Sequence, residues 1–175
     1  KDGQSWKGEL GVFDDIHIDG LSRLARDIHK EKSLLIAQLF HGGLQADENL
    51  TGSRPISASR TKSRLSKTGF SKQASEKEII RVISDFKDAA HRCHEAGFDG
   101  VEIHGAHGYL ITQFLGIKTN LRSDSWGGSL NNRSRLLIEI LRTMRDELPE
   151  NFIVGVRISP EIKTLGIRLD DSIEL

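Results

Sequence analysis

Apolar residues recur along the chain in two alternating patterns. A stretch with apolar positions three and four residues apart, typical of an amphipathic helix, is followed each time by a short apolar run typical of a buried strand. This pairing occurs three times, with helices expected after Asp19, after Ser75 and from about Asn132, and strands expected at 34–39, 99–104 and 153–158. Repeated helix–strand units predict an α/β fold with a parallel sheet.

Capping residues mark the ends of these helices. Asp19 is a candidate N-cap for the first helix, and Ser75 with Glu78 has the spacing of a capping box before the second. Gly97 is placed to end the second helix in a left-handed conformation, and Pro149 stops the third. The second helix is therefore the most strongly marked of the three.

Polar or glycine-rich residues follow the end of every predicted strand. A doubly wound sheet and a (β/α)8 TIM barrel both produce helix–strand alternation, but polar groups at several carboxyl strand ends favour the active face of a barrel. Three strands do not close a barrel of eight, and 169–175 has the pattern of a helix, capped by Asp170 or Asp171, that stops early. We therefore expect 1–175 to be one portion of a (β/α)8 barrel, about three parallel strands with their helices, truncated at both ends.

Residues 41–74 form a long connection with little apolar periodicity. Connections of this length in compact domains are usually functional lids or disordered segments. This connection carries a cluster of basic residues, namely Arg60, Lys62, Arg64, Lys67 and Lys72. These side chains either contact anionic groups or belong to a solvated loop.

Composition narrows the function classes. The 175 residues include 25 Lys plus Arg and 25 Asp plus Glu, and this balance argues against a strongly basic nucleic-acid binder. No apolar run reaches the roughly 20 residues that span a bilayer, and the first residues lack the layout of a signal peptide. With Cys93 as the only cysteine, no disulfide framework is available, so we expect a cytoplasmic protein.

Two histidines stand at the end of the middle strand. Side chains alternate along a strand, and the glycine at 105 lets the chain turn, so His104 and His107 can approach each other. Such a pair can hydrogen-bond one substrate oxygen, coordinate a divalent metal, or form hydrogen bonds with backbone groups only. The pair alone leaves these three alternatives open.

The surrounding sequence resembles one enzyme family. The segment 96–110 (AGFDGVEIHGAHGYL), continued by Gln113-Phe114-Leu115 and by the DSWGGS turn at 124–129, is similar to the Old Yellow Enzyme family of FMN-dependent ene-reductases and NADH:flavin oxidoreductases. The stretches 38–43 (QLFHGG) and 156–160 (VRISP) match the same family in the same order. The resemblance covers nearly the whole chain and implies a (β/α)8 barrel that binds FMN. Leu44 departs from it, because many members have arginine at that position.

The resemblance also implies roles for five residues. His104 and His107 would hydrogen-bond the carbonyl oxygen of an unsaturated substrate, and Tyr109 would protonate the substrate carbon opposite the hydride. A phenol stays protonated at neutral pH and can donate a proton. Gln38 would contact the pyrimidine edge of the flavin, and Arg157 would lie near flavin N1 and O2.

We therefore expect an oxidoreductase that takes hydride from NADH or NADPH and reduces an activated C=C bond of a small-molecule substrate. No metal, nucleic acid or membrane partner is expected, and a homo-oligomer is possible. Two alternatives remain: a metal-dependent barrel hydrolase, and an incomplete, catalytically inactive half-barrel that associates with itself through exposed sheet edges.

Overall fold

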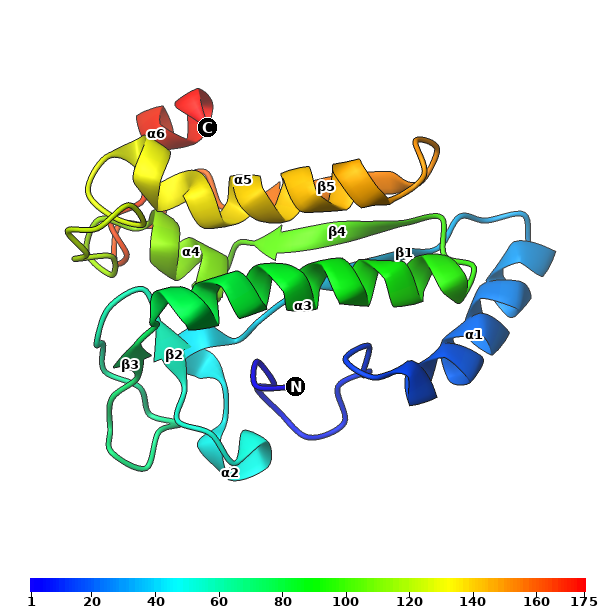
Figure 1. Cartoon of the computed structure of the whole chain (residues 1–175), viewed down its shortest axis with the longest axis horizontal. Coiled ribbons are helices and arrows are strands. Elements are labelled where there is room, and N and C mark those ends of the chain that lie inside the picture. The colour runs from blue at the N-terminus through cyan, green and yellow to red at the C-terminus, as the bar shows by residue number, and fades with distance from the viewer.

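The computed structural model describes residues 1–175 and contains a three-stranded parallel sheet of order β1–β4–β5. Helices α3 and α5 lie over one face of this sheet, and α1 packs beside α3 (Figure 1). The elements in chain order are η1 Asp15–His17, α1 Ile18–Lys30, β1 Ile36–Leu39, η2 Gly43–Gln45, α2 Glu48–Thr51, β2 Ile56–Ser57, β3 Lys72–Gln73, α3 Glu76–Glu95, β4 Gly100–Gly105, α4 Leu110–Leu115, α5 Leu130–Glu147, β5 Ile153–Ile158 and α6 Leu169–Glu174. The three predicted helix–strand units are all present.

Two predicted helix caps are wrong. Asp19 lies in the first turn of α1, because the chain turns earlier, in η1, where the Asp14 side chain accepts a hydrogen bond from Ile16 N at 3.2 Å. Helix α6 is preceded by Arg168, which makes no side-chain cap, and Asp170 and Asp171 lie in its first turn. Carboxylates in a first turn still interact favourably with the helix dipole, which explains why the sequence signal resembled a cap.

The predicted capping box of α3 is confirmed. Ser75 Oγ accepts from Glu78 N at 3.3 Å, and Glu78 Oε2 accepts from Ser75 N at 3.0 Å. Lys72 Nζ lies 2.6 Å from Glu78 Oε1. Although burial opposes the shift, the hydrogen bonds from Lys72 and Ser75 lower the pKa of Glu78 to about 2. At the other end Gly97, with φ of 87°, supplies the predicted left-handed residue.

The core lies between the helices and the face of the sheet that they cover. Val101 and Ile103 point from β4 toward α3 and are fully buried, as are Ile140 and Met144 of α5. Cys93 of α3 belongs to the same core, and burial raises the pKa of its thiol to about 12. The opposite face of the sheet carries no helix (Figure 1).

The connection at 41–74 contains η2, α2 and the short parallel pair β2–β3. Arg122, 7% exposed, donates from Nη1 to the carbonyl oxygens of Ala58 and Ala74, and its guanidinium also binds Asp124. Ser57 and Ser71 in this connection are fully buried. Long-range polar contacts therefore order a segment that lacks an apolar period of its own, and the prediction that it acts as a lid stays a prediction.

Candidate active site

Polar side chains gather on the helix-free face of the sheet, at the carboxyl ends of its strands. The register pairs Gln38 with Glu102 and His104 with Arg157. Side chains of paired residues in a parallel sheet project to the same side, and Glu102 and His104 are two residues apart on one strand. These four residues therefore share one face, opposite the buried Val101.

The two predicted histidines lie together. The ring centroids of His104 and His107 are 4.9 Å apart with an interplanar angle of 81°. His107 has φ of 57° and Gly108 φ of 78°, and these consecutive left-handed residues turn the chain back over the end of β4. His107 N also donates to Ser159 Oγ at 3.3 Å, which ties this turn to the residues after β5.

Tyr109 completes the cluster. Its ring centroid lies 5.1 Å from that of His104 and 5.1 Å from that of Phe40. Phe40 in turn stacks on Trp6 at 5.7 Å. Sequence reasoning missed Phe40, although its position two residues after Gln38 places it on the same face by strand alternation. The contact between Phe40 and Trp6 joins residues 34 positions apart in the sequence, so no local sequence pattern predicts it.

His104 is the most unusual group of the cluster electrostatically. Its side chain is 5% exposed, and Nδ1 is buried without a hydrogen-bond partner. Burial, followed by the nearby His107 and Arg157, lowers the pKa of His104, so the ring is neutral at pH 7. A buried nitrogen that has no partner is costly in a purely structural residue and is typical of a site that handles a ligand or proton.

Gln38 and Arg157 flank the cluster on the neighbouring strands. Gln38 Nε2 donates to Glu102 Oε1 at 2.5 Å, and its amide oxygen remains free. Arg157 is exposed and makes no side-chain hydrogen bond or ion pair in the structure. An amide and an unengaged cation on one sheet face match the polar edge of a flavin, whose carbonyl and imide groups need donors and acceptors and whose reduced form is anionic. The residues present thus fit FMN.

A buried amide positions both loops of the site. Gln113, 0% exposed, donates to the carbonyl oxygens of Gly42 and Gly108 at 3.3 and 2.7 Å and accepts from Leu44 N at 3.1 Å. It thereby joins the residues after β1 to those after β4. The departure at Leu44 leaves this backbone contact intact, because the bond uses the main-chain N–H.

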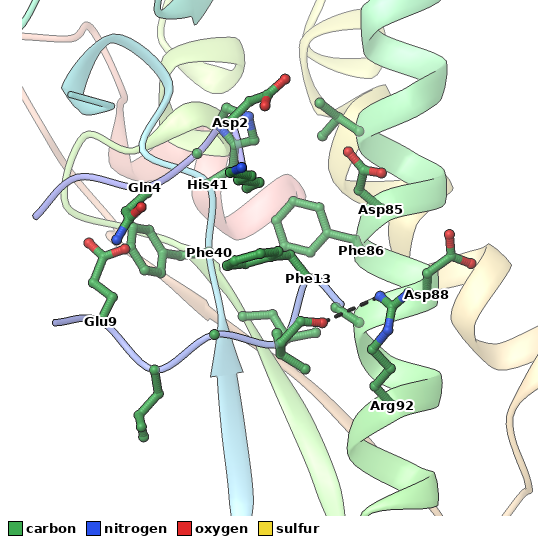
Figure 2. Close-up of a pocket in the computed structure, with 18 of the residues that line it drawn as sticks. Asp2, Gln4, Glu9, Phe13, Phe40, His41, Asp85, Phe86, Asp88 and Arg92 are labelled. Carbon is green, nitrogen blue, oxygen red and sulfur yellow. Dashed lines mark hydrogen bonds between the residues drawn. The ribbon is translucent and has the colours of Figure 1, made fainter. Parts of the chain in front are cut away.

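A separate cavity of about 350 Å³ runs along β1, between the N-terminal segment and α3 (Figure 2). Phe13 and Phe86 point into it, and Asp85 and Arg92 lie on α3 at its side, where Arg92 donates to the carbonyl of Val12. It reaches Gln38 and Phe40 but none of the histidine–tyrosine cluster. The histidine–tyrosine cluster therefore lies outside this cavity, and Gln38 and Phe40 lie at its border.

The structure contains no group of three or more His, Cys, Asp or Glu side chains placed to hold a metal ion. None of its helices has the length and apolar character needed to cross a membrane.

Residues 1–167 match the model of the NADH:flavin oxidoreductase / NADH oxidase family. The chain belongs to this family. It is 38% identical to NADH:fumarate oxidoreductase of Klebsiella pneumoniae over 99% of its length, and 40% identical to NADPH dehydrogenase of Clostridium acetobutylicum over 87%. Its structure is similar to the Old Yellow Enzyme homologue from Zymomonas mobilis, with a TM-score of 0.86, 30% identity and 95% of the chain covered.

The chain spans less than half the length of these relatives. The matched region spans 19% of the Klebsiella protein, 44% of the Clostridium protein and 49% of the Zymomonas structure. The predicted fold class is confirmed, since the parallel strands and helices match part of an Old Yellow Enzyme barrel. The prediction of nicotinamide and flavin chemistry is confirmed at the level of the family.

Proposed function

We propose that the protein is an FMN-dependent oxidoreductase that takes hydride from NADH or NADPH and reduces a C=C bond conjugated to a carbonyl group. The observation that carries this proposal is the cluster at the end of β4, where the rings of His107 and Tyr109 lie 4.9 and 5.1 Å from the ring of His104. Gln38 and Arg157 lie beside His104 on the same face of the sheet. The family match supplies the cofactor class.

The chain's own residues have distinct tasks in this reaction. When bound, FMN supplies the hydride that originates in the nicotinamide. Gln38 and Arg157 would hold its polar edge, and the fixed cation favours negative charge there. His104, neutral at pH 7 because its pKa is lowered, would donate a hydrogen bond to the substrate carbonyl together with His107. Charge that develops on that oxygen as the β-carbon gains hydride is thereby stabilised.

Tyr109 would complete the reduction. The α-carbon of the alkene needs a proton once hydride has reached the β-carbon, and the phenol lies next to the His104 ring that holds the carbonyl. One hydride and one proton add across the double bond, and water restores the proton on Tyr109. The aromatic contact with Phe40 orients the phenol.

The direct test separates flavin binding from chemistry. The chain is incubated with FMN, separated from free flavin by gel filtration, and assayed with NADH or NADPH and an enone such as cyclohexenone. Tyr109→Phe is expected to retain flavin and its reduction by the nicotinamide while alkene reduction falls by about 10²-fold or more. Unchanged alkene turnover in Tyr109→Phe would refute the donor role.

A second candidate concerns the isolated chain, which we infer associates with itself through its sheet edges. Strands β1 and β5 each have one unpaired edge, and apolar side chains on or beside them are exposed, including Ile36 at 45%, Ile153 at 41% and Val156 at 40%. Sedimentation velocity is expected to show a sedimentation coefficient that rises with concentration. A compact monomer at every concentration would rule this association out.

A further inference from the structure

A second cavity, of about 550 Å³, lies outside the candidate active site. It opens where the connection at 52–72 meets the first turns of α3, beside the N-terminal segment. Neither the histidine–tyrosine cluster nor Gln38 and Arg157 line it. Its walls are almost entirely polar and carry four cations and two carboxylates, namely Arg54, Lys72, Lys77, Arg81, Asp2 and Glu78.

The cations outnumber their partners. Lys72 is paired with Glu78 at 2.6 Å, and Arg81 with Asp2 at 2.8 Å. Four positive and two negative charges leave a balance of 4 − 2 = +2. Arg54 and Lys77 make no ion pair, so the excess charge resides on these two side chains. A concave site with a net positive charge attracts anions.

Arg54 is held in position without being neutralised. Its Nε donates to the carbonyl of Phe70 at 3.0 Å and Nη2 to the carbonyl of Ser71 at 3.3 Å. Carbonyl oxygens are neutral acceptors, so they orient the guanidinium and leave its charge and its Nη1 donors available. A guanidinium that is already ordered loses less entropy when it binds a phosphate oxygen.

The helix end itself is not the binding element. Ser75 and Glu78 already satisfy the first amide groups of α3 through the capping box. The carboxylate of Glu78 stays ionised and engaged, because its pKa is lowered to about 2. Binding would therefore depend on the side chains of Arg54 and Lys77, which substitutions can address one at a time.

Size indicates the class of ligand. Sites for small organic molecules commonly enclose about 300 to 1,000 Å³, and this cavity falls within that range. A phosphomonoester carries a charge close to −2 at neutral pH, which complements the excess of +2. We propose that this cavity binds the phosphate group of a phosphorylated small organic molecule, held between Arg54 and Lys77.

The proposal revises the expectation for the basic loop. Only Lys72 of the five basic residues singled out in the sequence lines the cavity. Arg60 instead stacks on the ring of Phe70, with its guanidinium carbon 3.9 Å from the ring centroid. Lys67 is exposed and lies outside the cavity, so it serves as a matched control for charge.

The test is calorimetric titration of the 175-residue chain with adenosine 5′-monophosphate, adenosine and inorganic phosphate, at low and at 0.15 M salt. Adenosine monophosphate is expected to saturate below 5 mM, and the other two probes to bind at least tenfold more weakly. Lys77→Glu is expected to weaken adenosine monophosphate binding at least tenfold, whereas Lys67→Glu changes it less than twofold. Glutamate in the first turn of α3 is favourable to the helix, so Lys77→Glu should fold normally.

Several results would overturn the proposal: no saturation by adenosine monophosphate at 5 mM, equal binding of adenosine, equal binding of inorganic phosphate, or equal losses in the two lysine variants. Titration with NADPH and NADH identifies the source of the phosphate. A Lys77-dependent preference for NADPH assigns the cavity to the 2′-phosphate of the reductant, and the absence of a preference assigns it to a separate phosphorylated molecule. None of these titrations requires flavin, so failure of the proposed enzymatic function would leave their interpretation unchanged.

Discussion

Protonation of His41 should destabilise the folded chain between pH 6.5 and pH 4. The imidazole is 9% exposed, and its Nδ1 accepts a hydrogen bond from Gly43 N at 3.0 Å. Burial lowers the pKa of His41 to about 4 from the ordinary 6.5. Protonation at Nδ1 abolishes the acceptor and places a charge in the protein interior, so the folded state binds this proton far less readily than the unfolded chain does.

The sign and size of the effect follow from linkage. Between pH 6.5 and 4 the unfolded chain holds a proton on His41 that the folded chain lacks, so stability is complete above pH 6.5 and decreases as the pH falls. A shift from 6.5 to about 4 corresponds to a maximum loss of about 3 kcal/mol, of which about 2 kcal/mol is lost by pH 5. Because the side chain is buried, solvent screening does not reduce this figure appreciably.

The assay is urea unfolding followed by circular dichroism at pH values from 8 to 5. His41→Asn keeps an acceptor near the position of Nδ1 but does not titrate, so its stability should fall by about 2 kcal/mol less than that of the wild type between pH 8 and pH 5. Loss of the ring lowers its stability equally at every pH. His94→Asn, a substitution at an exposed histidine that makes no ion pair, should keep the wild-type dependence. Parallel pH profiles for wild type and His41→Asn would refute the reasoning.

Three further predictions concern buried side chains. Gln113→Leu should lower the free energy of unfolding by about 3 kcal/mol in the same urea assay, because it removes the partners of Leu44 N and the Gly42 carbonyl in a buried site; a loss below 1 kcal/mol would contradict this. Arg122→Lys should cost about 2 kcal/mol or more, since an ammonium group cannot reproduce the fork to two carbonyls and Asp124, and wild-type stability would refute it. Cys93, with a pKa raised to about 12, should react with a thiol reagent at pH 8 only when urea unfolds the chain; rapid labelling of the native protein would contradict its burial.

Helices and strands that have a hydrophobic pattern of their own were predictable from the sequence. Strand β5 has the predicted bounds because 153–158 is an uninterrupted apolar and β-branched run apart from Gly155 and Arg157. Strand β1 begins two residues later than predicted, at Ile36, since strand pairing rather than hydrophobicity sets its start. The order in 41–74 was not predictable, because it depends on Arg122, which lies 48 residues beyond its end.

In the candidate site, too, some features were predictable from the local sequence and others were not. Strand alternation and the glycine at 105 were enough to predict that His104 and His107 meet, and the structure places their rings 4.9 Å apart. The left-handed conformation of His107 was not foreseeable, since positive φ is uncommon for any non-glycine residue, even though histidine adopts it more often than most. The roles assigned to these residues came from the family resemblance and remain proposals.

The geometry of the cluster depends on polar groups that take no part in the proposed chemistry. His107 leaves β4 through a left-handed turn, a conformation that a non-glycine residue adopts only when its surroundings hold it there. Those surroundings are Gln45 and Gln113, which bind the Gly108 carbonyl at 2.9 and 2.7 Å, and Ser159, which accepts from His107 N. Each lies on a different segment of the chain. The position of His107 over the sheet therefore depends on three connections packing together, and a perturbation in any of them should reach the cluster before it reaches the apolar core.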